Sequence, residues 1–138
     1  MTSRQVRDRP ERMFGTLLSV ALGGAVGATL RFLFGMGVFK LVGPTSFPVA
    51  ILSVNVIGSF LMGVFVVLAA QRGLTHLSPL VMTGLLGGFT TFSAFSLEAV
   101  TLYERGAMGL AALYVSLSVI LSIAGLMAGL ALARSVLT

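Results

Sequence analysis

Four long apolar stretches, separated by short polar segments, make up most of the chain. They cover approximately residues 14–39, 49–70, 79–103 and 108–133. An apolar helix of about 20 residues spans the hydrocarbon core of a bilayer. We therefore predict an all-α membrane protein with four transmembrane helices, in which a basic polar N-terminal tail (residues 1–12) precedes a single membrane domain (residues 13–138).

The third stretch contains residues that disfavour a helix. Gly87, Gly88, Thr90 and Thr91 lie in its middle. Glycine costs about 1 kcal/mol relative to alanine in a helix, and β-branched threonine also disfavours one. We expect the third helix to unwind near Gly87 to Thr91.

Unwound backbone at membrane depth needs protein or a polar cavity to receive its free groups, and broken helices of this kind often hold ions. Carbonyls freed at Gly87 and Thr90 would suit a hard cation such as Na⁺. The alternative is a helix kink that packs against a second copy of the chain.

The composition supports a membrane setting and narrows the possible functions. Hydrophobic residues make up 57% of the chain and charged residues only 9%, too few to cover a soluble domain. The net charge of +5 follows the usual pattern of basic residues beside apolar spans, so the lipid bilayer rather than nucleic acid is the expected partner. The sequence contains no recognisable catalytic triad, metal-ligand cluster or paired carboxylates, and so we expect no enzyme.

Neutral polar residues recur inside the spans. Asn55 lies in the second span, where an unpartnered amide is costly; it either bonds to another helix or donates to a permeating anion. Tyr114, Ser118 and Ser122 are four residues apart and share one face of the fourth span, as a packing stripe or as a row of hydroxyl donors. Such neutral donors could replace the hydration shell of a small anion.

The second half of the third span carries Phe92, Phe95 and Glu98 at three-residue spacing, on one helix face. Phenylalanines in a span ordinarily pack, but beside a helix break their positive ring edges could contact an anion. Glu98 and Arg31 are charges near span ends, suited to snorkelling or to a structural ion pair. Arg31 could also raise the local anion concentration at a vestibule.

Segments from all four spans resemble one known family, the fluoride-specific ion channels (Fluc or CrcB proteins). Their third-helix signature is matched by residues 87–98, GGFTTFSAFSLE. The patterns of their other helices resemble GGAVGATLRF (23–32), NVIGS (55–59) and the row Tyr114, Ser118 and Ser122. The resemblance covers essentially the whole chain after the tail.

The resemblance implies an antiparallel, dual-topology homodimer with two pores along its interface, which exports fluoride passively across the cytoplasmic (inner) membrane. It implies that fluoride meets the ring edges of Phe92 and Phe95 and a polar path made of Asn55, Tyr114, Ser118 and Ser122. It also implies a structural Na⁺ on the twofold axis, held by the carbonyls of Gly87 and Thr90, and places Arg31 towards a vestibule, where we also expect Glu98.

One departure from the family pattern is visible at Ala94, where the family usually has threonine. If that missing hydroxyl serves the fluoride path or the helix turn, we expect the conductance to differ.

Two other functional classes fit the topology. A small multidrug-type exporter has similar size, but it needs a membrane-embedded carboxylate for proton coupling; the first span has none, and Glu98 lies late in the third. A non-conducting membrane assembly subunit would also show glycine-rich helix faces. It would not need Asn55 and the polar row of the fourth span.

Overall fold

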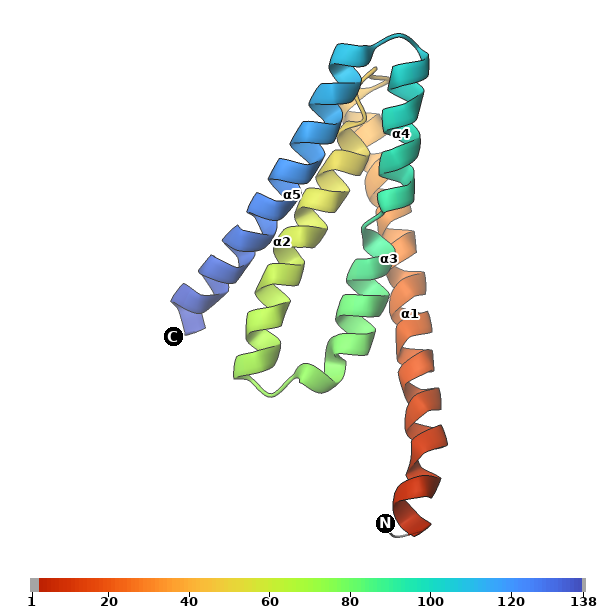
Figure 1. Ribbon diagram of the computed structural model, residues 1–138, viewed down its shortest axis with the longest axis vertical. Helices are drawn as coiled ribbons and strands as arrows, with labels where there is room; N and C mark the ends of the chain where they lie inside the picture. The colour runs from red at the N-terminus through yellow and green to blue at the C-terminus, as the bar shows by residue number, and fades with distance from the viewer. Residues whose placement is uncertain (1–2, 138) are drawn as a thin grey trace.

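The computed structural model describes residues 3–137, and these residues form a bundle of long helices (Figure 1). In chain order the elements are α1 (Ser3–Val42), α2 (Val49–Gln71), η1 (Thr75–Leu77), η2 (Pro79–Leu86), α3 (Gly87–Phe89), α4 (Phe92–Glu104) and α5 (Met108–Leu137). Residues 1 and 2 of the expected tail lie outside the described residues. α1, which forms the first span, begins at Ser3 and therefore includes residues 3–12 of the expected tail.

Four helical segments of the described chain are long and apolar enough to cross a membrane: Pro10–Val42, Val49–Gln71, Thr75–Glu104 and Met108–Leu137. This confirms the prediction of an all-helical, four-span protein. Large apolar side chains point outwards, among them Phe14 (69% exposed) and Phe32 (67% exposed). In water such a surface would be unfavourable, whereas lipid or a second subunit can cover it, as expected for a multi-pass membrane protein.

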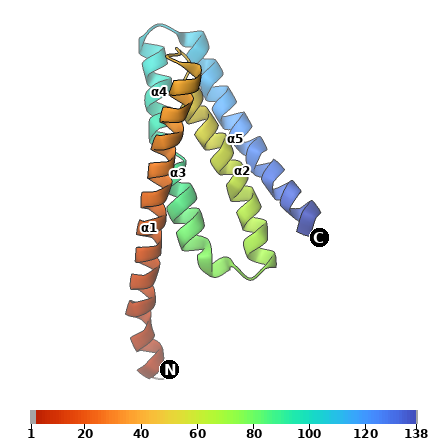
Figure 2. The same cartoon turned by 180° about the vertical axis from the view of Figure 1, so that it is seen from behind.

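The helices pack as two pairs. α2 packs along α5, and α1 packs along η2 and α3. Both views show the two pairs close together at the end that carries the α4–α5 connection and apart towards the end that carries the chain termini (Figures 1 and 2). The third span changes neighbour along its length, because η2 and α3 lie against α1 whereas α4 contacts α5.

Glycines allow α1 and the first half of the third span to touch backbone to backbone. A Cβ added at Gly27 would meet the carbonyl of Leu85 and lie 2.8 Å from the amide nitrogen of Phe89. A Cβ at Gly88 would lie 2.7 Å from the carbonyl oxygen of Gly24. Small residues of this kind let membrane helices approach closely. Packing therefore explains Gly88, one of the glycines that we expected to mark unwinding.

The break in the third span is shorter than the sequence indicates. Gly87–Phe89 is helical, and the prediction that Gly87 and Gly88 would be unwound is wrong. Only Thr90 (φ −78°, ψ 160°) and Thr91 (φ −154°, ψ 120°) are extended. Before the break, η2 is a π-helix, in which the amide of Gly87 reaches the carbonyl of Met82, five residues earlier.

Candidate ion pathway at the break in the third span

The two ends of the break are closed by different hydrogen bonds, one from the backbone and one from a side chain. α3 closes with the amide of Thr90 donating to the carbonyl of Leu86 at 2.9 Å. α4 begins with Thr91 as N-cap, whose Oγ1 accepts a hydrogen bond from the amide of Ala94 at 3.2 Å. A threonine cap of this kind stabilises a helix start by about 1 kcal/mol.

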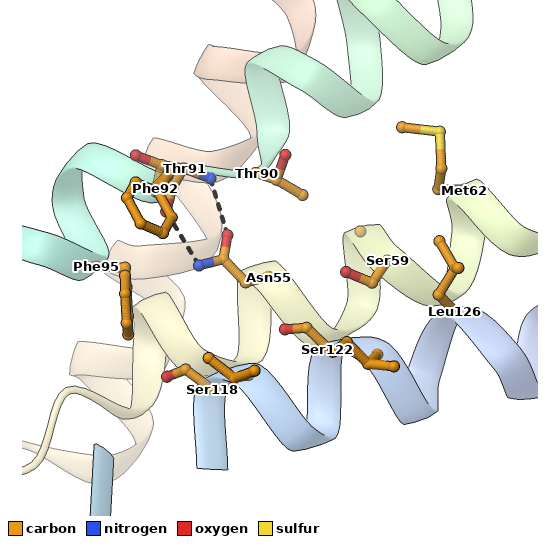
Figure 3. Close-up of a pocket in the computed structure, with 13 residues that line it drawn as sticks. Asn55, Ser59, Met62, Thr90, Thr91, Phe92, Phe95, Ser118, Ser122 and Leu126 are labelled. Carbon is orange, nitrogen blue, oxygen red and sulfur yellow. Dashed lines mark hydrogen bonds between the residues drawn. The ribbon is translucent and has the colours of Figure 1, made fainter. Parts of the chain in front are cut away.

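Asn55 of α2 forms hydrogen bonds with both backbone groups of Thr91, in place of helical partners. Its Nδ2 donates to the carbonyl oxygen of Thr91 at 3.0 Å, and its Oδ1 accepts from the amide of Thr91 at 2.8 Å (Figure 3). Thr91 is only 7% exposed, so these groups would be costly without partners. The interpretation of Asn55 as a bond to another span is confirmed. Since its amide nitrogen carries two hydrogens, one donor is left beyond the bond to Thr91.

The bonds that the amides of Thr91 and Ala94 make to side chains leave the predicted carbonyls, those of Gly87 and Thr90, without helical donors. The carbonyl of Gly87 would accept from the amide of Thr91, which is bound to Asn55. The carbonyl of Thr90 would accept from the amide of Ala94, which is bound to the Thr91 hydroxyl. Within residues 3–137 these two carbonyls, at the C-terminal end of the η2–α3 segment, therefore lack their usual helical donors and lie at the negative end of a helix dipole.

A groove of about 400 Å³ lies beside the break, between α2, α4 and α5. Five residues of the expected fluoride pathway line it: Asn55, Phe92, Phe95, Ser118 and Ser122. Figure 3 shows their side chains converging from the three helices. The groove is neutral, because none of its lining residues carries a charge. Such a groove can offer hydrogen-bond donors to an ion without holding it by a full opposite charge.

Tyr114 belongs to the same cluster but lies behind the groove. Its ring packs on that of Phe95, with centroids 5.4 Å apart, and Phe95 in turn packs on Phe92 at 5.3 Å. Tyr114 is fully buried. Within the described residues its hydroxyl has no hydrogen-bond partner, and neither does that of Ser118. Buried hydroxyls normally have a hydrogen-bond partner, so these two are unusual.

The expected vestibule residues lie outside the groove of a single chain. Arg31 lines a separate cavity of about 560 Å³ on the α1 side, together with Lys40 and Ala94. Glu98 lines a third cavity with Arg105, near the loop that joins α1 to α2. Ala94, where we expected a hydroxyl to be missing from the path, thus faces the Arg31 cavity rather than the groove.

Several residues of this site escaped the sequence analysis. Thr91 both caps α4 and anchors Asn55, which no local pattern indicated. Ser59 and Met62 also line the groove. Ser59 follows Asn55 by one helical turn on the same face, a spacing that is visible in the sequence, but it was not assigned to the ion path.

The fold and the groove together define a class: a small multi-pass helical membrane protein whose neutral polar side chains gather where one span is broken. Residues 18–130 match a family model described as CrcB-like protein, Camphor Resistance (CrcB). The chain belongs to this family, as the sequence resemblance indicated.

Relatives with high identity support the assignment. The chain is 68% identical over 126 residues to the fluoride-specific ion channel FluC of Ruegeria sp. (strain TM1040), covering 91% of this chain and 100% of that protein. It is 68% identical over 122 residues to the protein of the same name from Roseobacter denitrificans, covering 88% and 97%. A third relative with this name, from Jannaschia sp. (strain CCS1), is 84% identical over 91 residues, 66% of this chain and 87% of that protein. These names describe ion channels and not enzymes.

Proposed function

We propose that this protein is a fluoride-selective channel that lets fluoride leave the cell passively across the cytoplasmic membrane. The observation that carries the proposal is the neutral groove, in which amide and hydroxyl donors and aromatic rings meet beside a helix break. The names of the relatives agree with this function.

The donors of the groove would replace the water around a dehydrated fluoride. Asn55 has a second N–H, Ser118 and Ser122 have hydroxyls, and the rings of Phe92 and Phe95 have positive edges. No cation lines the groove, so fluoride is not trapped and can leave. In this proposal the closed pathway is too narrow for larger halides.

The pathway needs a second subunit to close it. Phe92 lines the groove and yet is 78% exposed in one chain. We place a second copy over this face, in an antiparallel homodimer with two pathways, one for each groove. In this arrangement the Arg31 cavity of each copy would serve as a vestibule.

The absence of cysteine allows a direct test of dual topology. Thr75→Cys, in the exposed η1 turn, should react with a membrane-impermeant maleimide in roughly half of the molecules in sealed cell-derived vesicles, as a twofold antiparallel pair requires. Labelling of nearly all or nearly none of the molecules would contradict the antiparallel arrangement.

The freed carbonyls of Gly87 and Thr90 fit a hard monovalent cation where two breaks meet. Gly87 is exposed, and an added Cβ would meet only the carbonyl of Met82 from its own span, so a partner's break has room to approach. Bound Na⁺ would supply the positive charge that these carbonyl dipoles lack. Purified protein should then unfold at a higher Tm in sodium than in N-methylglucamine at equal ionic strength. Equal Tm values would argue against the sodium site.

Liposomes containing only this polypeptide test the function. We expect a fluoride electrode to record rapid fluoride efflux, and a chloride electrode to record only slow chloride efflux. A multidrug-type exporter would instead move a cationic substrate only under a proton gradient, and an assembly subunit would conduct nothing. Absence of fluoride efflux from correctly folded protein would remove the proposed function.

Two substitutions test the pathway itself. Phe92→Ile removes an exposed ring of the groove, and Asn55→Asp replaces a donor with a negative charge. Both should abolish fluoride efflux while leaving the dimer intact. Phe14→Ile changes a similarly exposed ring outside the groove (69% exposed) and should conduct like the unmodified protein. Unchanged efflux in both pathway variants would exclude this groove as the route.

A further inference from the structure

One aromatic residue outside the groove contacts the ring cluster that lines it. Phe47, in the loop between α1 and α2, meets Tyr114 edge to face, with ring centroids 5.7 Å apart and an interplanar angle of 88°. The ring of Tyr114 also packs on that of Phe95, with centroids 5.4 Å apart. Phe47, Tyr114, Phe95 and Phe92 therefore form one continuous row of rings, from the loop to the groove.

The local sequence holds Phe47 in place. Pro48 has φ −77° and ψ 65°, the geometry of an inverse γ-turn, and proline restricts φ to this region in the unfolded chain as well. The turn is closed by the amide of Val49, which donates to the carbonyl oxygen of Phe47 at 2.8 Å. The hydroxyl of Thr45 donates to the same oxygen at 2.8 Å. Two hydrogen bonds thus hold the backbone of Phe47 at the start of α2.

Tyr114 is held by packing contacts, two of which are with aromatic rings. The side chain is fully buried, and within the described residues its hydroxyl oxygen has no hydrogen-bond partner. The rings of Phe47 and Phe95 both contact the tyrosine ring and therefore help to set its tilt. A shift of Tyr114 would release Phe95, whose ring lines the groove.

We infer that Phe47 is a positioning residue for anion selection: by holding Tyr114, it fixes the ring of Phe95 against the ion pathway. Phe47 itself does not line the groove. The inference rests on the proposed function, since it concerns selectivity for fluoride. Its structural half, the control of Tyr114 by Phe47, can be measured without any ion.

The functional experiment compares fluoride with chloride efflux from liposomes for Phe47→Ala and Phe47→Tyr. Loss of the ring should let Phe95 relax, and the ratio of fluoride to chloride efflux should fall at least tenfold. Phe47→Tyr keeps the ring and should restore a ratio close to that of the unmodified protein. Phe14→Ala, which removes an exposed ring in the N-terminal part of α1, serves as the matched control and should leave the ratio unchanged.

The structural experiment uses the two tyrosines of a chain that has no tryptophan. Tyr103 is 59% exposed, so Tyr103→Phe leaves Tyr114 as the only strong emitter at little structural cost. In this background Phe47→Ala should raise the acrylamide quenching constant of Tyr114 at least twofold. Phe47→Tyr is not used here, because it would add an emitter. Phe47→Leu fills part of the space and should give a quenching constant between that of the protein with Phe47 intact and that of Phe47→Ala.

If Phe47→Ala does not fold, Thr45→Val provides a milder perturbation. It removes one of the two bonds to the Phe47 carbonyl, whereas Thr45→Ser retains the hydroxyl. We expect a two- to fivefold drop in the ion ratio for Thr45→Val and none for Thr45→Ser.

The outcomes separate the two proposals. If the unmodified protein conducts no fluoride, the proposed function fails, while the quenching experiment still tests the control of Tyr114. The inference is overturned if the unmodified protein conducts fluoride but Phe47→Ala leaves the ratio of fluoride to chloride efflux unchanged. Where Phe47→Ala does not fold, the same result for Thr45→Val overturns it. This holds even if quenching rises, because Phe47 would then only pack. Unchanged quenching in Phe47→Ala would overturn it as well.

Discussion

The two halves of the third span have opposite surroundings although they are continuous in sequence. Before the break, η2 and α3 lie against α1 with glycine backbones in contact. After the break, α4 borders a groove lined by an amide, hydroxyls and aromatic rings. The first half is therefore held by close packing, and the second by side-chain hydrogen bonds at its start.

This contrast assigns different roles to residues that look alike in the sequence. Gly88 serves the contact with α1, whereas Gly87 is helical and exposed, and a Cβ added there would meet only the carbonyl of Met82 in its own span. Thr90 continues the hydrogen bonding of α3, since its hydroxyl donates to the carbonyl of Leu86 at 2.9 Å. Thr91 instead caps α4 and bonds to Asn55. Four substitutions in the chain can test this division, from the largest expected effect to the smallest.

Gly27→Ala should have the largest effect, because the new methyl group would meet backbone atoms of Leu85 and Phe89, which cannot rotate away. We expect a loss of about 3 kcal/mol or more in the free energy of unfolding, the upper range for overpacking. Denaturant unfolding in detergent measures it. Gly109→Ala has no atom within 4 Å of the added Cβ and should be neutral or slightly stabilising. Similar values for the two variants would show that this contact does not hold the first half of the span.

Asn55→Ala should destabilise the protein by about 2 kcal/mol, because the amide and carbonyl of Thr91 would both lose their partners at membrane depth. The measurement is the same unfolding experiment, combined with fluoride efflux, which should also be lost. Ser59→Ala, one turn further along α2 in the same groove, is the control, and its stability should change by less than about 0.5 kcal/mol. A fully stable Asn55→Ala variant would mean that the break does not depend on α2.

Thr91→Val should cost about 1 kcal/mol, because valine keeps the branched shape but cannot accept the hydrogen bond from the amide of Ala94. Thr91→Ser keeps the hydroxyl and should remain within about 0.5 kcal/mol of the unmodified protein. Thermal unfolding of the three proteins side by side distinguishes a capping role from a packing role, since packing alone would make valine the better replacement.

Thr90→Val should have the smallest effect, within about 0.5 kcal/mol, although Thr90 is next to Thr91. Its hydroxyl only adds a bond to a carbonyl, that of Leu86, which already accepts the amide of Thr90. Its methyl group, which contacts Gly58, is retained in valine. An effect as large as that of Thr91→Val would contradict the separate roles of the two threonines.

Much of this architecture could be predicted from the chain alone. The four spans follow from apolar runs long enough to cross a bilayer, and the presence of a break follows from glycines and threonines in the third run. The candidates Asn55, Phe92, Phe95, Ser118 and Ser122 do line one groove. Composition and helical spacing suffice for the spans and the break, because these depend on residues within one helix. The grouping of the five candidates, which come from α2, α4 and α5, was implied by the family resemblance.

The remaining features depend on contacts between spans. The break lies at Thr90 and Thr91, and not at the glycines, because Gly88 packs on α1 and because Asn55, 36 residues away in the chain, bonds to the backbone of Thr91. Tyr114 lies behind the groove because Phe95 and Phe47 cover its ring. Local propensity sets the free-energy cost of unwinding, but the position at which a helix opens is the one where another span satisfies the released hydrogen-bonding groups.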